Sequence, residues 1–337
     1  MNSVARENRN LIPMKPIVTV KSITIVLRPK GYPLETQARV KALLPIMKFF
    51  NSKSIRKFCF AFAVCLLSTG VQAQVPDLSL DYLPPHWLAI RGDHFPGKEI
   101  RINYLEAYCR AGSTDADWVQ HTVIKHTPEL ISLSDDKKSL RLRDKVEDGV
   151  VVDHIITATT EEISFEIKAH NPTSEVSEIH WAQPCIRLAD FTGYDNKGKD
   201  IDDYLPKCFL FVDGKLARMN SIVPWVKEAR YTPGQVWCPK DVPRTDVNPR
   251  PLSSIVPSNG LIGCFSSDEK WIFAVAFDPY QELFQGVARC LHSDFRIGGL
   301  KPDETKNIHG KIYIVANDLT AFRARYEKDF PNHVEKN

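Results

Sequence analysis

Apolar and polar residues alternate along much of the chain after residue 74. Segments 139–143 and 162–168 place an apolar side chain at every second position, which is typical of antiparallel strands with one buried face. Between them, four apolar residues share strand parity: Val150, Val152, Ile156 and Ala158. Turn-forming pairs such as Asp148-Gly149, Asn171-Pro172 and Asn259-Gly260 separate the apolar runs. The pattern predicts an all-β fold, an antiparallel β-sandwich.

One helix is predicted, at the C-terminus, over residues 318–330. Asn317 or Asp318 can cap it, and Pro331 ends it. Its apolar residues recur at steps of three and four: Leu319, Phe322, Tyr326 and Phe330. Such a stripe is typical of a helix that packs one face on a sheet.

The most irregular segment runs from residue 224 to 257. It contains seven prolines and two tryptophans, Trp225 and Trp237. Proline cannot donate a hydrogen bond to a sheet, so this segment is not a central strand. It is either an ordered binding loop, in which a tryptophan stacks on a sugar, or a surface loop tied down at Cys238.

The three parts of a secretory signal peptide lie inside the chain. Basic residues at 48–57 precede ten apolar residues at 58–67, and Val71-Gln72-Ala73 resembles a cleavage site. We therefore expect residues 1–46 to be a non-native upstream extension, 47–73 a signal peptide and 74–337 a single β-sandwich domain. The mature protein would be secreted or periplasmic, with no membrane attachment after cleavage.

Removal of residues 1–73 reverses the net charge. This segment holds 12 of the 44 Lys and Arg residues and only two of the 41 Asp and Glu residues. Residues 74–337 therefore hold 32 basic and 39 acidic residues, a net charge of −7. An acidic domain without a basic stripe gives no reason to expect a nucleic acid partner.

Six cysteines remain after cleavage: Cys109, Cys185, Cys208, Cys238, Cys264 and Cys290. An even number in an exported protein favours disulfides, although the spacing does not choose among fifteen pairings. Buried free thiols are the alternative. No Cys-x-x-Cys pair is present, and we expect no metal site and no cofactor.

Segment 148–185 carries a resemblance to a known family. It contains Asp148-Gly149, two strands, Asn171-Pro172-Thr173 and then His180-Trp181-Ala182-Gln183-Pro184, and a later element begins at 300–305. This order resembles the galactose mutarotase-like (aldose epimerase-like) β-supersandwich proteins. The resemblance implies a pyranose across a concave sheet face, with His180 matching the histidine that donates a proton to the ring oxygen. The family's His-Pro-Tyr-Phe-like run is different here, and its catalytic glutamate has no clear match.

A second candidate group is Cys290-Leu291-His292-Ser293-Asp294. His292 and Asp294 share strand parity, so their Cα atoms would stand about 6.6 Å apart on one face. This geometry suits an acid–base pair or two metal ligands, or only a hydrogen bond at a loop edge. We assign the catalytic role to His180, His292 and Asp294.

Three further residues are candidates for substrate binding: Trp181, Arg187 and Trp237. In a regular strand Trp181 points away from the face of His180. His154 shares the apolar face of Val152 and Ile156, which indicates a structural histidine of the core.

No Gly-x-Ser-x-Gly elbow, P-loop, His-Glu-x-x-His motif or Gly-rich dinucleotide turn is present. The sequence therefore favours an exported protein that acts on or binds carbohydrate, with sugar epimerase-like or mutarotase-like acid–base chemistry. The alternative is a non-catalytic binding or structural sandwich of the cell envelope.

Overall fold

The computed structural model describes residues 77–112, 118–194, 204–222, 235–247, 252–286 and 288–334. All of them belong to the unit formed by residues 74–337. The predicted upstream extension, signal peptide and cleavage site lie outside the described residues, as does Trp225. The division of the chain at residue 73 stays a prediction.

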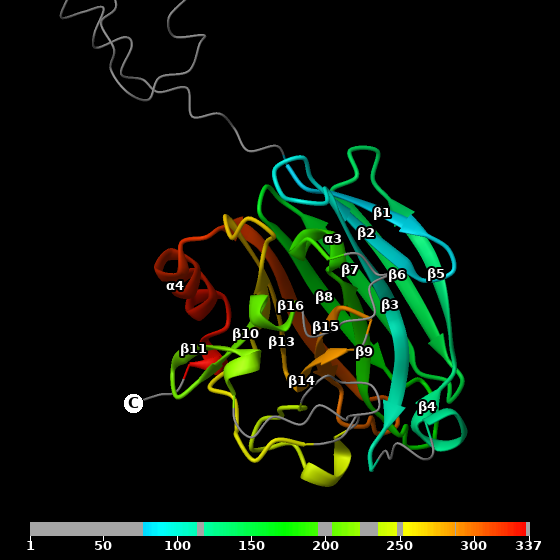
Figure 1. Cartoon of the computed structure of the whole chain (residues 1–337). Coiled ribbons are helices and arrows are strands. Elements are labelled where there is room, and N and C mark those ends of the chain that lie inside the picture. The colour runs from blue at the N-terminus through cyan, green and yellow to red at the C-terminus, as the bar shows by residue number, and fades with distance from the viewer. Residues whose placement is uncertain are drawn as a thin grey trace, which may run out of the picture. The chain divides into compact units, whose positions relative to one another are not determined.

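Two antiparallel sheets form this unit (Figure 1). Sheet A has the order β1-β2-β3-β9-β15-β14, with β4 beside β3. Its strands are β1 (Ser79–Leu83), β2 (Trp87–Arg91), β3 (Glu99–Arg110), β4 (Val123–Ile124), β9 (Ile179–Arg187), β14 (Tyr280–Gly286) and β15 (Cys290–Arg296). The predicted all-β class and antiparallel sandwich are confirmed.

Sheet B has nine strands in the order β11-β10-β12-β13-β16-β8-β7-β6-β5. Their bounds are β5 (His126–Leu133), β6 (Ser139–Val146), β7 (Val151–Ala158), β8 (Glu162–His170), β10 (Cys208–Val212), β11 (Lys215–Arg218), β12 (Ile262–Phe265), β13 (Trp271–Asp278) and β16 (Thr305–Ala316). Short helical turns are η3 (Trp118–Thr122), α3 (Ala189–Thr192), η4 (Leu205–Lys207), η5 (Met219–Ser221), η6 (Arg244–Asp246) and η7 (Pro331–His333).

The main core lies between the two sheets. On β8 the residues Ile163, Phe165 and Ile167 are buried, and the polar residues between them are not. Leu291 and Phe295 of β15 face the same core from sheet A. The alternation in the sequence thus marks the inward face of each strand, because only that face is removed from water.

Helix α4 (Leu319–Asp329) covers the outer face of sheet B at one end (Figure 1). The Asp318 side chain accepts hydrogen bonds from the backbone N–H groups of Thr320 and Ala321, which caps the helix. Phe322 and Tyr326 pack in one cluster with Ala274 of β13. The predicted terminal helix is confirmed, and within the described residues no helix is long and apolar enough to cross a membrane.

The proline-rich segment packs beside β14. Trp237 and Leu283 exchange both backbone hydrogen bonds, with N···O distances of 2.9 and 2.7 Å. Val236, Val242 and Val247 form a small core with Phe284. The described part of this segment is therefore ordered and covers β14, the edge strand of sheet A.

A buried polar cluster connects β3 with β6 and β7. Asp144 accepts a hydrogen bond from the Tyr108 hydroxyl (2.9 Å) and lies 3.1 Å from Nε2 of His154. The Tyr104 hydroxyl lies 2.8 Å from Nδ1 of His154, and Nε2 of His126 lies 3.8 Å from Asp144. His154 is buried with a partner on each nitrogen, which confirms it as a structural histidine of the core.

This cluster predicts that stability falls in acid. Burial lowers the pKa of His126, so the unfolded state takes up a proton first as the pH falls below about 6.5, and the fold loses stability there. Burial acts to raise the pKa of Asp144, but His154 outweighs it and the net pKa is lowered. A second loss of stability is therefore expected below about pH 4. Urea unfolding between pH 8 and 3 measures both losses of stability, and His126→Gln should remove the upper one.

Candidate functional site

The candidate site lies on the face of sheet A that points away from the core. Arg296 of β15 stands opposite Trp181 of β9, and Cys290 stands opposite Arg187. Since side chains alternate along a strand, residues 181, 183, 185 and 187 share this outer face with residues 290, 292, 294 and 296. On the other side of β15, Phe284 of β14 is paired with His292.

His292 and Asp294 lie side by side on this face, as their parity predicts. Nδ1 of His292 is 3.5 Å from Oδ1 of Asp294, and the two side chains are only 3% and 0% exposed. The imidazole stacks on Phe284 with ring centroids 4.1 Å apart. Neither oxygen of Asp294 has a hydrogen bond partner, and burial raises the pKa of this carboxyl to about 7.

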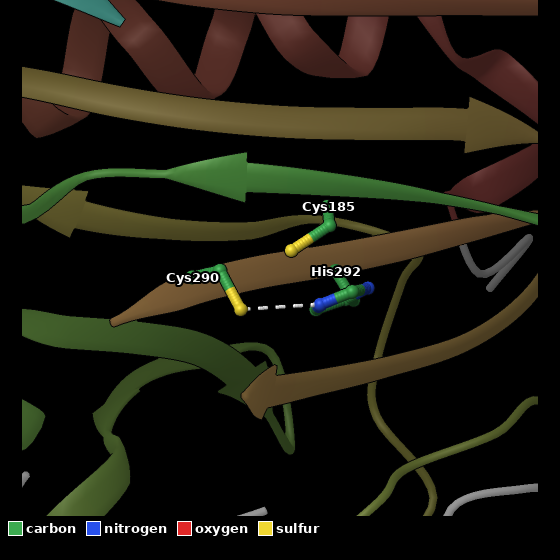
Figure 2. A group of neighbouring side chains, drawn as sticks. All are labelled: Cys185, Cys290 and His292. Carbon is green, nitrogen blue, oxygen red and sulfur yellow. Dashed lines mark hydrogen bonds between the residues drawn. The ribbon is translucent and has the colours of Figure 1, made fainter. Parts of the chain in front are cut away.

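A cluster of sulfur and nitrogen atoms lies on the same face. Cys185, Cys290 and His292 point toward one another from β9 and β15 (Figure 2). Sγ of Cys290 is 3.3 Å from Nε2 of His292. The adjacent Cys185 thiol holds the pKa of Cys290 well below its usual value. Burial acts to lower the pKa of His292, but Cys290 and Asp294 outweigh it and raise the pKa to about 10.

All six cysteines of the described residues are buried and free. The disulfides that the even count favours are not present, and the alternative of buried thiols describes this structure. Cys208 and Cys264 are directly opposite each other on β10 and β12, and Cys185 faces Cys290. Sequence spacing could not identify these neighbours, because each pair joins strands that are far apart in the chain.

His180 belongs to a different cluster at the start of β9. Its side chain is 28% exposed, and its Nδ1 lies 3.5 Å from Oδ2 of the buried Asp246. Nη1 of Arg296 donates a 3.0 Å hydrogen bond to the same carboxylate oxygen, and the backbone N–H of Gly112 donates to the other oxygen at 3.0 Å. Gln281 accepts a hydrogen bond from Arg296 and donates one to the Asp246 carbonyl.

The two histidines assigned to catalysis have different carboxylate neighbours. His292 is paired with Asp294, whereas His180 is paired with Asp246. A joint catalytic role of the three residues stays a prediction. Asp246 and Arg296 were not identified from the sequence. A signal for Asp246 was its position in the proline-rich segment, for which an ordered binding loop was one of the two alternatives.

The three predicted substrate-binding residues have little free surface. Trp181 is 0% exposed and packs with Ala107 and Cys109, and Trp237 is 1% exposed. Nη1 of Arg187 donates to the carbonyl of Ala288 at 3.4 Å. A binding role for these residues stays a prediction, and in this arrangement neither indole presents a face to solvent.

A groove of about 600 Å³ lies elsewhere, on the outer face of sheet B. It crosses β5, β6, β7, β8 and β16. Charged and polar side chains line much of it: Arg141, Arg143, Asp153, Glu166, Lys168 and His309. Ile131 and Ile155 supply apolar surface. This groove has the polarity of a solvated sheet face.

Neither a known family model nor a curated protein matches the sequence. Solved structures do match in fold. A candidate aldose 1-epimerase from Escherichia coli K12 is 13% identical with a TM-score of 0.33, covering 56% of this chain and 69% of its own. A galactose mutarotase related enzyme from Lactobacillus acidophilus is 8% identical with a TM-score of 0.37, and the match covers 71% of this chain and 97% of that enzyme. A galactose mutarotase-like protein from Lactobacillus casei is 10% identical with a TM-score of 0.36, and the match covers 71% of this chain and 100% of that protein. These structures belong to the kind of protein that the sequence resembles, and the similarity to them is one of fold, at low identity and low TM-score.

Proposed function

We propose that this chain is an exported protein that performs acid–base chemistry on a carbohydrate, with His180 as the proton-transferring group. The observation that carries the proposal is the pairing of His180 with Asp246. His180 is a partly exposed imidazole whose Nδ1 faces a buried carboxylate, which leaves Nε2 for a substrate. A histidine is suited to give and take protons near neutral pH.

Asp246 acts as the positioning residue. Its carboxylate orients the imidazole and stabilises the positive charge that His180 gains when it takes up a proton. Arg296 and the Gly112 N–H hold this carboxylate in place. Both oxygens of this buried side chain accept hydrogen bonds, so its polar atoms are satisfied without water.

Two arguments support a sugar as the substrate class. The polar groups around Asp246, from Arg296 and Gln281, are of the kind that bind neighbouring hydroxyls. The solved structures of similar fold carry the names of sugar epimerases and mutarotases, which is an analogy of fold. The signal-peptide pattern of residues 47–73 supports export.

His180→Ala should lower turnover by about 100-fold or more with the fold intact. Anomer exchange of a panel of aldoses, followed by NMR with the protein recovered from the exporting cell, measures the rate. N-terminal sequencing of the same sample should begin at Gln74. The matched control is His170→Ala, since His170 ends β8 on sheet B and bonds only Thr305 among the described residues. Equal rates in wild type and His180→Ala would contradict the proposal.

The groove on sheet B favours a second candidate function, non-catalytic binding. Its paired charges, including Arg143 with Asp153 and the nearby Lys168, could hold a polar ligand without any reaction. In that case no aldose would be turned over, and Lys168→Ala would weaken ligand binding whereas His180→Ala would not.

A further inference from the structure

We propose that Cys185, Cys290 and His292 bind one zinc ion on the outer face of sheet A. This site goes beyond the proposed function, because it uses none of the residues around His180. It gives His292 a role as a metal ligand in place of the acid–base role expected from the sequence. The proposal rests on the convergence of three donor atoms, on the space beside them and on the groups behind His292.

The three donor atoms are already close enough for one ion. The two sulfurs and a nitrogen of His292 all lie within 4.8 Å of one another. A tetrahedral zinc with Zn–S bonds of about 2.3 Å and Zn–N bonds of about 2.0 Å separates nitrogen and sulfur by about 3.5 Å and two sulfurs by about 3.8 Å. The observed 3.3 Å between Cys290 Sγ and His292 Nε2 is near the first value. Small side-chain rotations would suffice.

The neighbouring strand leaves room at the donors. Gly286 of β14 is directly opposite Cys290. A Cβ at this position would stand 2.5 Å from Sγ of Cys290 and 3.4 Å from Nε2 of His292. Only a residue without a side chain at position 286 therefore allows the Cys290 sulfur to lie here, next to His292. Phe284, stacked on the imidazole, fixes the plane of the ring.

The second ring nitrogen of His292, Nδ1, has a carboxylate neighbour, as in many metal-binding histidines. When Nε2 binds a metal, Nδ1 carries a proton and needs an acceptor, often a carboxylate. Asp294 is fully buried, has no hydrogen bond partner and lies 3.5 Å from Nδ1. An Nδ1–H bond to Asp294 would satisfy one of these buried oxygens.

The ligand types select the metal. Two thiolates and one imidazole suit zinc, and the thiolates disfavour magnesium and calcium, which take oxygen ligands. Three protein ligands leave a fourth position for water or another ligand. Binding displaces the two thiol protons to solvent, since both sulfurs bind as thiolates.

The test uses the full chain, purified without chelator and then titrated with Zn²⁺ and, separately, with Co²⁺. We expect one zinc per chain by native mass spectrometry. Bound Co²⁺ should show the charge-transfer band of thiolate ligation together with the visible bands of a tetrahedral ion. Cys290→Ser and His292→Ala should abolish the site, and Asp294→Asn should weaken zinc binding about 10–100-fold.

The matched control is Cys208→Ser. Cys208 is also buried and also faces a second cysteine, Cys264, but it belongs to sheet B. The Cys208→Ser variant should bind one zinc with unchanged affinity. Equal loss of zinc in Cys208→Ser and Cys290→Ser would overturn the site. So would folded wild-type protein that shows no thiolate–cobalt band, or a Cys185–Cys290 disulfide in protein prepared without reductant.

These results do not depend on sugar turnover. Because wild-type spectra are sufficient to reject the site, a variant that fails to fold does not leave the question open. His180→Ala should retain the zinc, and this variant separates failure of the metal site from failure of the acid–base proposal.

Discussion

Asp144→Ala is expected to lower the free energy of unfolding by about 3–5 kcal/mol, because it removes the carboxylate that the side chains of a buried polar cluster share. Asp144 is 2% exposed and lies between the sheets. Its loss takes the carboxylate away from the Tyr108 hydroxyl and from Nε2 of His154, which then have only each other at 3.2 Å. Neither group can turn to water, so the cluster stays buried with fewer hydrogen bonds. Urea unfolding at pH 7 measures the change.

The matched control is Asp153→Ala on the next strand. Asp153 forms a two-point ion pair with Arg143, but both side chains are about 40% exposed. Exposed pairs contribute about 0–1 kcal/mol. If Asp144→Ala destabilised the protein no more than Asp153→Ala, the buried cluster would not be a source of stability.

The fold was predictable from the sequence where a strand has one buried face and one solvent-exposed face. On β8 the alternation of Ile163, Phe165 and Ile167 with polar residues identifies both the strand and its inward side. On β13 the same reading fails, because Ala274 is buried under α4 while Phe273 faces the other sheet. A strand that is covered on both faces has no reason to alternate. The pairing order of the strands is also set by packing and cannot be obtained from periodicity.

The candidate site was predictable only in its local part. His292 and Asp294 are two residues apart, so parity alone placed them on one face. Their neighbours come from other strands: Cys185 from β9 and Gly286 from β14. Asp246 reaches His180 from the proline-rich segment across 66 positions of sequence. No local pattern specifies such contacts, because they depend on which strands become neighbours.

Phe277→Ala should also lower the free energy of unfolding by about 3–5 kcal/mol, because it opens a cavity among aromatic rings. Phe277 is 1% exposed and packs on Phe165 and Phe295, with ring centroids 5.5 and 5.3 Å away. Leu130→Ala, on the exposed surface of β5, should change it by less than about 0.5 kcal/mol. Thermal and urea unfolding of the two variants give the comparison.

A double-mutant cycle with Gly310 makes this prediction sharper. Gly310 is directly opposite Phe277 on β16, and a Cβ there would stand 2.2 Å from the Phe277 ring. Gly310→Ala alone should therefore destabilise the protein by about 1–3 kcal/mol through overpacking. In the Phe277→Ala background the ring is gone, so the same change should be neutral or stabilising. The expected coupling is about 1–3 kcal/mol. Additive effects would show that the ring does not pack on this glycine.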